Sequence, residues 1–142
     1  MAQPLVREVR PADAAFVAEL VGQLGYSASE SEARERMSGL DRSGQRLLVA
    51  ELDGDLAGIA LTQIAPVLIS DAPTCRLVLL VVAERARRQG VGRALVLAVE
   101  EGARRLGCDR IALESGAWRE EAHEFYRALG YEGVALEFQK RL

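Results

Sequence analysis

The chain has 142 residues, of which 49% are hydrophobic and 27% are charged, and its formal net charge at pH 7 is −3. This length suits a single domain, 1–142, with one hydrophobic core, and the composition is ordinary for a soluble globular protein. The slightly acidic balance argues against nucleic acid as the main partner, because nucleic-acid-binding surfaces are usually basic. No apolar run approaches the roughly 20 residues of a membrane-spanning helix, so we expect no membrane partner.

The N-terminal residues show no charged region followed by an apolar core, so no secretion signal is predicted. Cys75 and Cys108 lie far apart with no paired spacing. Two reduced thiols in a cytoplasmic protein are the simplest account of them. A single histidine and no Cys-x-x-Cys pair leave little from which to build a metal site, and we expect none.

The N-terminal third predicts one strand followed by two helices. Residues 5–9 alternate apolar and charged side chains, as a half-buried strand does. Residues 11–24 carry apolar side chains at helical spacing, with a proline near the start and a glycine after the end. Ser29 and Glu32 have the spacing of a capping box, which predicts a second, shorter helix reaching about residue 40.

The middle of the chain predicts three strands. Residues 46–52 form the first, and Asp53-Gly54 is a strong signal for a two-residue hairpin turn. We expect the return strand to run over residues 56–65 and to stop at Pro66. Residues 70–74 are rich in turn formers and predict a connection into the next strand.

The central strand is predicted from an apolar run over residues 77–83, which is rich in β-branched residues and too short for a helix. A basic turn follows, and residues 91–106 then carry apolar side chains at helical spacing. A further strand over residues 110–114 is placed beside the central one by the strand–helix–strand crossover.

The C-terminal part predicts a loop over residues 115–119, a helix over residues 120–129 capped by Gly130, and a last strand. The last strand is predicted from apolar side chains that alternate with other residues over 134–139: Val134, Leu136 and Phe138. The predicted order is strand, two helices, three strands, helix, strand, helix, strand. This order predicts an α/β (α+β) fold, a mixed and mostly antiparallel sheet with helices on both faces.

The basic turn, Arg87-Arg88-Gln89-Gly90-Val91-Gly92, lies between a buried strand and the start of a helix. The first backbone N–H groups of a helix lack partners, and the helix dipole favours negative charge there. Gly90 and Gly92 have no Cβ, so a phosphate could approach the main chain closely. Arginines at 87, 88 and 93 add charge that pairs with phosphate oxygens. The turn therefore predicts a cradle for a diphosphate.

Neither common nucleotide motif fits this turn. The P-loop run of Gly, four residues and Gly-Lys-Ser/Thr is missing, and only two of the three glycines of the dinucleotide fingerprint are present. The turn does resemble the acetyl-CoA-binding motif of the GNAT N-acetyltransferase superfamily, Gln/Arg-x-x-Gly-x-Gly/Ala, at every fixed position. The predicted order of elements matches the GNAT fold as well, so the resemblance covers the whole chain.

The resemblance implies that acetyl-CoA is the cosubstrate. In this family the motif holds the diphosphate, which here assigns cofactor binding to Arg87, Arg88, Gln89, Gly90, Val91, Gly92 and Arg93. The central strand of the family also pairs its main chain with the pantetheine arm, which implicates the backbone of Leu80 and Val82. The side chains of these two residues are otherwise simple core residues.

A second stretch, Ala122 to Tyr131, resembles the family pattern Ala-x-x-(Phe/Leu)-Tyr-x-x-x-Gly-(Phe/Tyr). The resemblance implies that Tyr126 lies near the cofactor sulfur and is the general acid that protonates the leaving thiolate. A phenol with a pKa of about 10 is protonated at neutral pH and can give its proton to such a group. The alternative is an aromatic side chain that only packs in the core.

The chain departs from the family pattern at two places. Many relatives carry asparagine seven residues before the tyrosine, where this chain has Arg119, which could reach the ligand or be a solvated charge at a helix start. Some family members have a glutamate on the central strand as the base, but residues 77–82 contain no acid. Glu51 and Glu114 are substitutes by location only, and a surface carboxylate explains each better.

Two further side chains near this stretch are ambiguous. His123 lies one helical turn from Tyr126, but a lone histidine is more often structural or on the surface, and we leave it out of the catalytic set. Trp118 could line an acceptor pocket or plug the edge of the core, and the core role is the more common one. The acceptor is not determined, although residues 11–40 and the loops near 70 and 118 set specificity in this fold. Three glutamates make the second helix acidic, which suits either a cationic acceptor or an ordinary solvated face: Glu30, Glu32 and Glu35.

The resemblance therefore implies an acetyl-CoA-dependent N-acetyltransferase that transfers acetyl to a primary amine of a small molecule or peptide by direct attack. The alternative is a non-catalytic CoA or acetyl-CoA-binding sensor or regulatory module, which would keep the turn at 87–92 but need no Tyr126. Many relatives pair as dimers, so a homodimer is compatible with the sequence.

Overall fold

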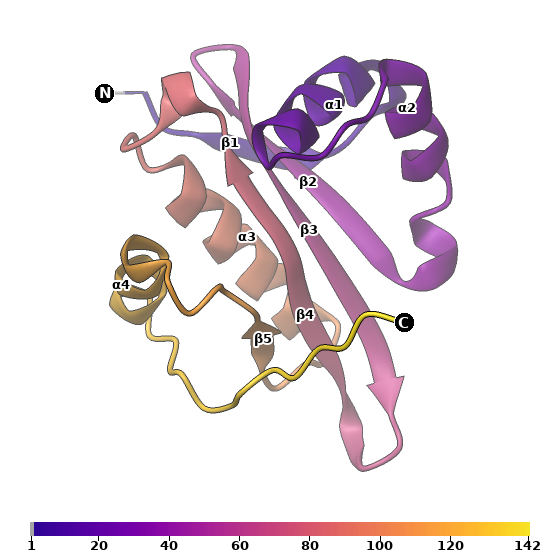
Figure 1. Ribbon diagram of the computed structural model, residues 1–142, viewed down its shortest axis with the longest axis vertical. Helices are drawn as coiled ribbons and strands as arrows, with labels where there is room; N and C mark the ends of the chain where they lie inside the picture. The colour runs from indigo at the N-terminus through magenta and orange to yellow at the C-terminus, as the bar shows by residue number, and fades with distance from the viewer. Residues whose placement is uncertain (1) are drawn as a thin grey trace. The chain divides into compact units, whose positions relative to one another are not determined.

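A computed structural model describes residues 2–142 (Figure 1), which separate into two compact units, one ending at Ala112 and the other running from Leu113 to Leu142. Each unit is described by itself. The first unit contains β1 (Leu5–Glu8), α1 (Ala14–Gln23), α2 (Glu30–Ser38), β2 (Gln45–Leu52), β3 (Asp55–Val67), β4 (Ser70–Val82) and α3 (Val91–Arg105). It also contains three 3₁₀ turns: η1 (Pro11–Asp13), η2 (Asp41–Ser43) and η3 (Glu84–Ala86). The short β5 (Ile111–Leu113) crosses the boundary, and α4 (Glu120–Ala128) lies in the second unit.

The strands form one sheet in the order β1-β2-β3-β4-β5. Each of the first three neighbouring pairs is antiparallel. Short hairpins join β2 to β3 and β3 to β4, whereas α1 and α2 lie between β1 and β2. Asp53 and Gly54 both have positive φ in the turn between β2 and β3, which is the hairpin geometry expected from their sequence. The expected fold class, a mixed and mostly antiparallel sheet with helices, is confirmed.

The centre of the sheet is covered on both faces. Consecutive residues of β2 and β3 are buried, which occurs only when both sides of the strands are packed. Figure 1 shows α1 and α2 on one side of these strands and α3 on the other. A Cβ on Gly58 would lie 3.0 Å from Val91 and 3.1 Å from Leu95, so the missing side chain lets α3 pack close to β3.

The outer end of the β3–β4 hairpin differs from the sequence prediction. Pro66 does not stop β3, and residues 70–74 are part of β4 rather than a connection, so the turn is only Leu68 and Ile69. The pairing register shifts between Ala65 and Val67, which places Pro66 in a bulge. Proline is tolerated there because a bulged residue need not donate to the ladder.

The predicted last strand is wrong. Residues 131–142 form no helix or strand, although their apolar residues alternate as predicted. Val134, Leu136 and Phe138 are 84%, 83% and 89% exposed. Alternation alone does not make a strand, because the backbone also needs a hydrogen-bonded neighbour.

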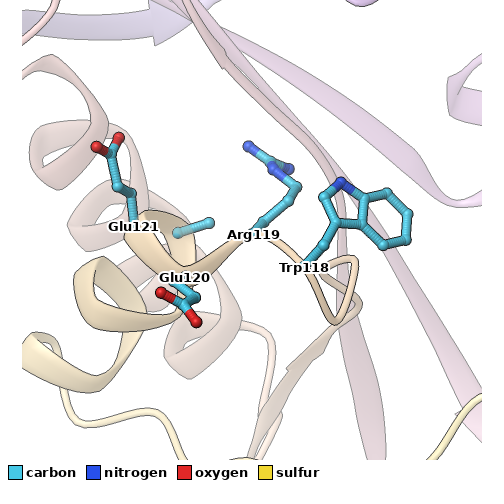
Figure 2. A pocket seen from close by; sticks show the side chains of 5 residues that line it. Trp118, Arg119, Glu120 and Glu121 are labelled. Carbon is cyan, nitrogen blue, oxygen red and sulfur yellow. The ribbon is translucent and has the colours of Figure 1, made fainter.

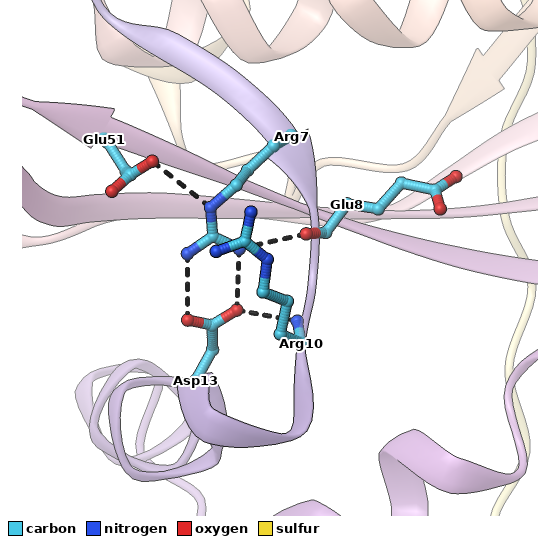
Figure 3. A network of polar contacts seen from close by, with 5 residues as sticks. All are labelled: Arg7, Glu8, Arg10, Asp13 and Glu51. Atoms are coloured by element: carbon cyan, nitrogen blue, oxygen red, sulfur yellow. Dashed lines mark hydrogen bonds and ion pairs between the residues drawn. The ribbon is translucent and has the colours of Figure 1, made fainter.

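A network around Arg7 fastens β1 to the elements beside it (Figure 3). The Arg7 guanidinium donates two hydrogen bonds to Asp13 of η1, at 2.9 and 3.0 Å, and one to Glu51 of β2, at 3.2 Å. Asp13 also accepts from the Arg10 backbone N–H at 2.7 Å. These bonds hold the pKa of Asp13 below its usual value, chiefly through the hydrogen bond from Arg7. The network fixes the start of α1 on the sheet.

Two further findings concern membranes and metal ions. No helix within residues 2–142 combines the length and apolar character that crossing a membrane demands. The same residues bring together no group of three or more His, Cys, Asp or Glu side chains that could hold a metal ion.

Candidate functional site

The turn from β4 to α3 combines two left-handed residues with the start of a helix. The chain leaves β4 at Val82, passes through η3 and enters α3 at Val91. Arg88 and Gly90 both lie in the left-handed region, with φ of 62° and 81°. Left-handed residues in a turn can point neighbouring N–H groups into one concavity, which binds anions. The geometry supports the cradle predicted at residues 87–93.

The first turn of α3 is not capped by a side chain of its own. Its N-cap is Gly90, and no side chain of residues 2–142 caps its first N–H groups. The N–H groups of Val91, Gly92 and Arg93 have no acceptor within the helix, because the first turn lacks preceding carbonyls. Ala94 is the first residue to bond back, to the Gly90 carbonyl at 3.0 Å. The start of α3 therefore offers several N–H donors and the positive end of a helix dipole.

Three arginine side chains add charge at this place. Arg87, Arg88 and Arg93 are exposed, and none of them forms an ion pair with any carboxylate in the part of the chain that the structure describes. Other arginines of the chain, such as Arg7 and Arg85, do have such partners. The charge at the cradle is thus left for a ligand or for solvent.

Arg85 anchors the turn before α3 to other elements of the first unit. Its guanidinium donates to the Leu56 carbonyl at 3.0 Å and to Glu19 of α1 at 3.1 Å, and it lies 5.8 Å from the centre of the Phe16 ring. Gln89 in turn donates to the Arg85 carbonyl at 3.3 Å, which bends the turn back on itself.

The main chain of Leu80 and Val82 points away from β3. The Ala83 N–H donates to the Ala57 carbonyl at 2.8 Å, and Val82 stands opposite Gly58 in the antiparallel register. Hydrogen-bonded pairs alternate with non-bonded ones in such a ladder, so the peptide groups of Val82 and Leu80 face the other edge of β4. β5, the neighbour there, has three residues against the thirteen of β4 and can pair with only part of that edge.

Sequence reasoning missed two residues at this site, Gln23 and Gly58. Gln23, the last residue of α1, donates to the Val82 carbonyl at 2.8 Å and accepts from the Glu84 N–H at 3.1 Å. Nothing in the sequence around it marks this contact, which joins residues about 60 positions apart. Gly58 could have been noticed, because a glycine inside a buried strand often marks a close approach of another element.

Tyr126 lies in the second unit, on α4. Its ring makes edge-on contacts with Phe125 and Tyr131, at centroid distances of 5.2 and 5.9 Å. Burial raises the pKa of its hydroxyl, while the positive charge of Arg119 acts in the opposite direction. The hydroxyl is therefore protonated at neutral pH, as a general acid must be.

The loop before α4 presents Trp118 and Arg119 to one side of an open hollow of about 380 Å³ (Figure 2). Glu120, Glu121 and Ala122 of the first turn of α4 complete its lining. Trp118 is 83% exposed, so its indole does not plug the core, and that interpretation is wrong. A Cβ on Gly116 would lie 2.7 Å from the indole, so the ring rests on the glycine.

His123 has a structural partner. Its Nε2 is 2.9 Å from the Gly116 carbonyl. A carbonyl oxygen only accepts, so Nε2 carries the proton in this contact and is not a free base. His123 holds the loop that carries Trp118, in agreement with its omission from the catalytic set.

The two carboxylates considered as bases have different surroundings. Glu51 is engaged by Arg7 in the network at β1, which gives it a structural role. Glu114 is exposed and lies in the second unit. On α2, Glu30 pairs with Arg34 at 2.9 Å and Glu32 with Arg36 at 3.5 Å, so most of the acidity of that helix is neutralised within it.

The two thiols do not form a nucleophilic site. Cys75 is buried in β4, and burial raises its pKa to about 11, so the thiolate is scarce at neutral pH. Burial also raises the pKa of Cys108, followed by the charge of Asp109. Neither cysteine lies in the turn at residues 87–93.

Comparison with known proteins gives a consistent result. The acetyltransferase (GNAT) family profile matches residues 14–131. An aminoglycoside N(6′)-acetyltransferase type 1 from Stenotrophomonas maltophilia is 30% identical over 132 residues, which are 91% of this chain and 86% of that protein.

Solved structures show the same fold. A Trypanosoma brucei acetyltransferase superposes with a TM-score of 0.86 at 24% identity, covering 99% of this chain and 100% of the other. The aminoglycoside N-acetyltransferase AAC(6′)-Iy in complex with CoA gives a TM-score of 0.81 at 20% identity, covering 100% of this chain and 97% of the other.

Proposed function

The chain belongs to the acetyltransferase (GNAT) family, and on that premise we propose that it binds acetyl-CoA and transfers the acetyl group to a primary amine. The observation that carries the proposal is the turn from β4 to α3. It combines uncapped N–H groups at a helix start with arginines that form no ion pair within residues 2–142. A diphosphate carries the charge and the acceptor oxygens that such a turn binds. The CoA bound by AAC(6′)-Iy, which has this fold, supports the choice of cofactor.

In this proposal the diphosphate is held by the backbone N–H groups from Arg88 to Arg93, with help from the charges of Arg87 and Arg88. The pantetheine arm pairs with the edge of β4 that carries the peptide groups of Leu80 and Val82. The register of β3 and β4 supports this assignment, because it turns those groups away from β3. Gln89, Gly90, Val91 and Gly92 complete the cradle through the main chain.

The chemistry is direct attack of a neutral amine on the thioester that acetyl-CoA supplies. A C–N bond forms, the C–S bond breaks, and the amine gives its proton to water. The leaving sulfur takes a proton from the Tyr126 hydroxyl, which is later reprotonated from solvent. Tyr126 is assigned this role because it occupies the tyrosine position of the family pattern, and a phenol is protonated at neutral pH.

A small-molecule amine is the acceptor class that the relatives favour. The Stenotrophomonas maltophilia protein is named for aminoglycosides, which are cationic amino sugars. The hollow beside Trp118 is lined by an exposed indole and by Glu120 and Glu121, together with the cationic Arg119. An aromatic face and carboxylates suit a cationic amino sugar. The glutamates of α2 are already paired with arginines and would contribute little to binding such an acceptor.

Isothermal titration with acetyl-CoA, CoA and NAD tests the cofactor assignment. We expect micromolar binding of both CoA species and much weaker binding of NAD, because NAD carries a diphosphate but no pantetheine arm. Thiol release is then measured with an aminoglycoside, a linear polyamine and a lysine peptide. If neither CoA species binds, the proposal is wrong; if both bind but no amine is acetylated, a CoA sensor becomes the better account.

Replacing Tyr126 with phenylalanine tests the general acid. We expect kcat to fall about 100-fold while the Kd for acetyl-CoA stays constant, because only the transferable proton is lost. Tyr131→Phe is the matched control, since it removes a hydroxyl from the neighbouring ring. Equal kcat in the Tyr126 variant and the wild type would remove Tyr126 from the mechanism.

A further inference from the structure

Gln23 fastens the chain at the point where β4 ends. Its Nε2 donates to the Val82 carbonyl, and its Oε1 accepts from the Glu84 N–H, so one amide bridges the two peptide groups on either side of Ala83. On the opposite side the Ala83 N–H donates to the Ala57 carbonyl. The exit from β4 is thus held from two directions.

The bond to Val82 lies on the edge of β4 that the proposed function gives to the pantetheine arm. The Val82 peptide groups face away from β3, so the Gln23 amide occupies the carbonyl on that edge. The Val82 N–H, one peptide earlier, faces the same way. Fixing the carbonyl limits rotation of the strand end, and the direction of that N–H is fixed with it.

We propose that Gln23 is a positioning residue for the acyl end of the cofactor. It holds the end of β4 so that the Val82 N–H keeps one direction toward the pantetheine arm. The inference rests on the proposed function. Because Gln23 is the last residue of α1, the same amide also ties the α1–α2 pair to the cofactor strand.

The cradle has fastenings of its own through Arg85 and Gln89, and these do not involve Gln23. The inference therefore predicts different effects on the binding of two parts of acetyl-CoA, the pantetheine arm and the diphosphate. Loss of the Gln23 amide is expected to weaken contacts with the pantetheine arm and to leave the diphosphate contacts intact. ADP carries a diphosphate without that arm and is the probe that distinguishes the two parts.

The test compares Gln23→Leu with Gln63→Leu by titration with acetyl-CoA and with ADP. Gln63 is a matched control because its amide also donates to a distant main-chain carbonyl, that of Ser43 at 3.3 Å, but at the outer part of the sheet. We expect Gln23→Leu to bind acetyl-CoA about tenfold more weakly, the scale of two lost hydrogen bonds, with ADP affinity unchanged. Gln63→Leu is expected to match the wild type for both ligands.

Gln23→Glu separates hydrogen bonding from side-chain volume. A carboxylate of the same size still accepts from the Glu84 N–H but cannot donate to the Val82 carbonyl at neutral pH. We expect it to weaken acetyl-CoA binding as the leucine variant does, with a similar Tm to the wild type. Unchanged acetyl-CoA affinity in both variants, or equal losses for ADP and acetyl-CoA, would overturn the inference. Failure of the wild type to bind acetyl-CoA would instead overturn the proposed function.

Discussion

The helices α2 and α3 differ in whether a side chain caps the N–H groups of the first turn. At α2 the Ser29 hydroxyl accepts from the Glu32 N–H at 3.0 Å, and the Glu32 carboxylate accepts from the Ser29 N–H at 3.1 Å. At α3 the N-cap is Gly90, and no side chain in the described part of the chain caps the first N–H groups. One helix start is completed by its own side chains, and the other is left open.

The arginines near these helix starts differ in the same way. Arg34 and Arg36 each pair with a glutamate one turn earlier on α2. Arg87 and Arg88, before α3, pair with no carboxylate in residues 2–142. The difference shows how to distinguish a structural charge from one available to a ligand: count the partners it already has within the chain.

The largest effect is expected from Gly90→Asp, which gives α3 a side-chain acceptor. The carboxylate would compete for the open N–H groups and repel a phosphate, and the left-handed φ adds strain. We expect acetyl-CoA affinity by titration to fall by more than about 100-fold. Gly90→Asn, which has the same shape without the charge, should lose much less; equal losses would mean that strain rather than charge controls the site.

Asp13→Asn is expected to act on stability and not on binding, because Arg7 and Asp13 are paired inside the chain. Their side chains are 18% and 7% exposed, so breaking the pair should lower the free energy of unfolding by about 2–3 kcal/mol at pH 7. The pKa of Asp13 is lowered by folding, so its stabilisation is present above the unfolded pKa of about 3.9 and is lost as pH falls through the lower folded value.

Urea unfolding of the wild type and Asp13→Asn at several pH values checks this sign. The difference in unfolding free energy should be largest near neutral pH and should shrink below about pH 4. A difference that stays constant down to pH 2 would show that the charge of Asp13 is not the cause. Acetyl-CoA affinity serves as the control and should not change.

Arg88→Gly sharpens the comparison because Arg88 holds a left-handed φ without being glycine. We expect a small gain in Tm, since about 1 kcal/mol of backbone strain is relieved, together with about tenfold weaker acetyl-CoA binding. Arg88→Ala removes the same charge but keeps the strain, so it should lose affinity without gaining Tm. A glycine variant that binds as well as the wild type would exclude the Arg88 side chain from diphosphate binding.

The smallest effect is expected from Ser29→Ala, which opens the start of α2. Losing an N-cap should lower the Tm by a few degrees, because one helix start loses its acceptor. Acetyl-CoA affinity should stay at the wild-type value. A clear loss of affinity would link α2 to the cofactor, which the contrast between the two helix starts does not predict.

Much of the fold was predictable because its signals are local. The capping box at Ser29, the hairpin turn at Asp53-Gly54 and the glycine-containing turn before α3 all depend on residues close in sequence. The predictions failed where backbone pairing with a distant segment decides whether residues form a strand. Pro66 is carried inside a strand by a bulge, and the alternating residues from Val134 to Phe138 form no strand.

In the candidate site, too, local features could be predicted and contacts between distant residues could not. The cradle at residues 87–93 could be predicted because one short segment supplies both its N–H groups and its charges. The role of Gln23 could not, since its partners Val82 and Glu84 lie on another element. Tyr126 stays a prediction as the general acid, and a single domain over residues 1–142 stays a prediction too.

The sequence by itself determined most of the helices and strands and the resemblance to the GNAT family, and it predicted the anion cradle at residues 87–93, because backbone preference and hydrophobic period act over a few residues. Only the tertiary structure decided which charges are already satisfied: it paired Arg7 with Asp13, tied Gln23 to Val82 and left Arg87 and Arg88 open. The physical reason is that hydrogen bonds and ion pairs depend on distance in space, and folding brings together residues that the sequence separates.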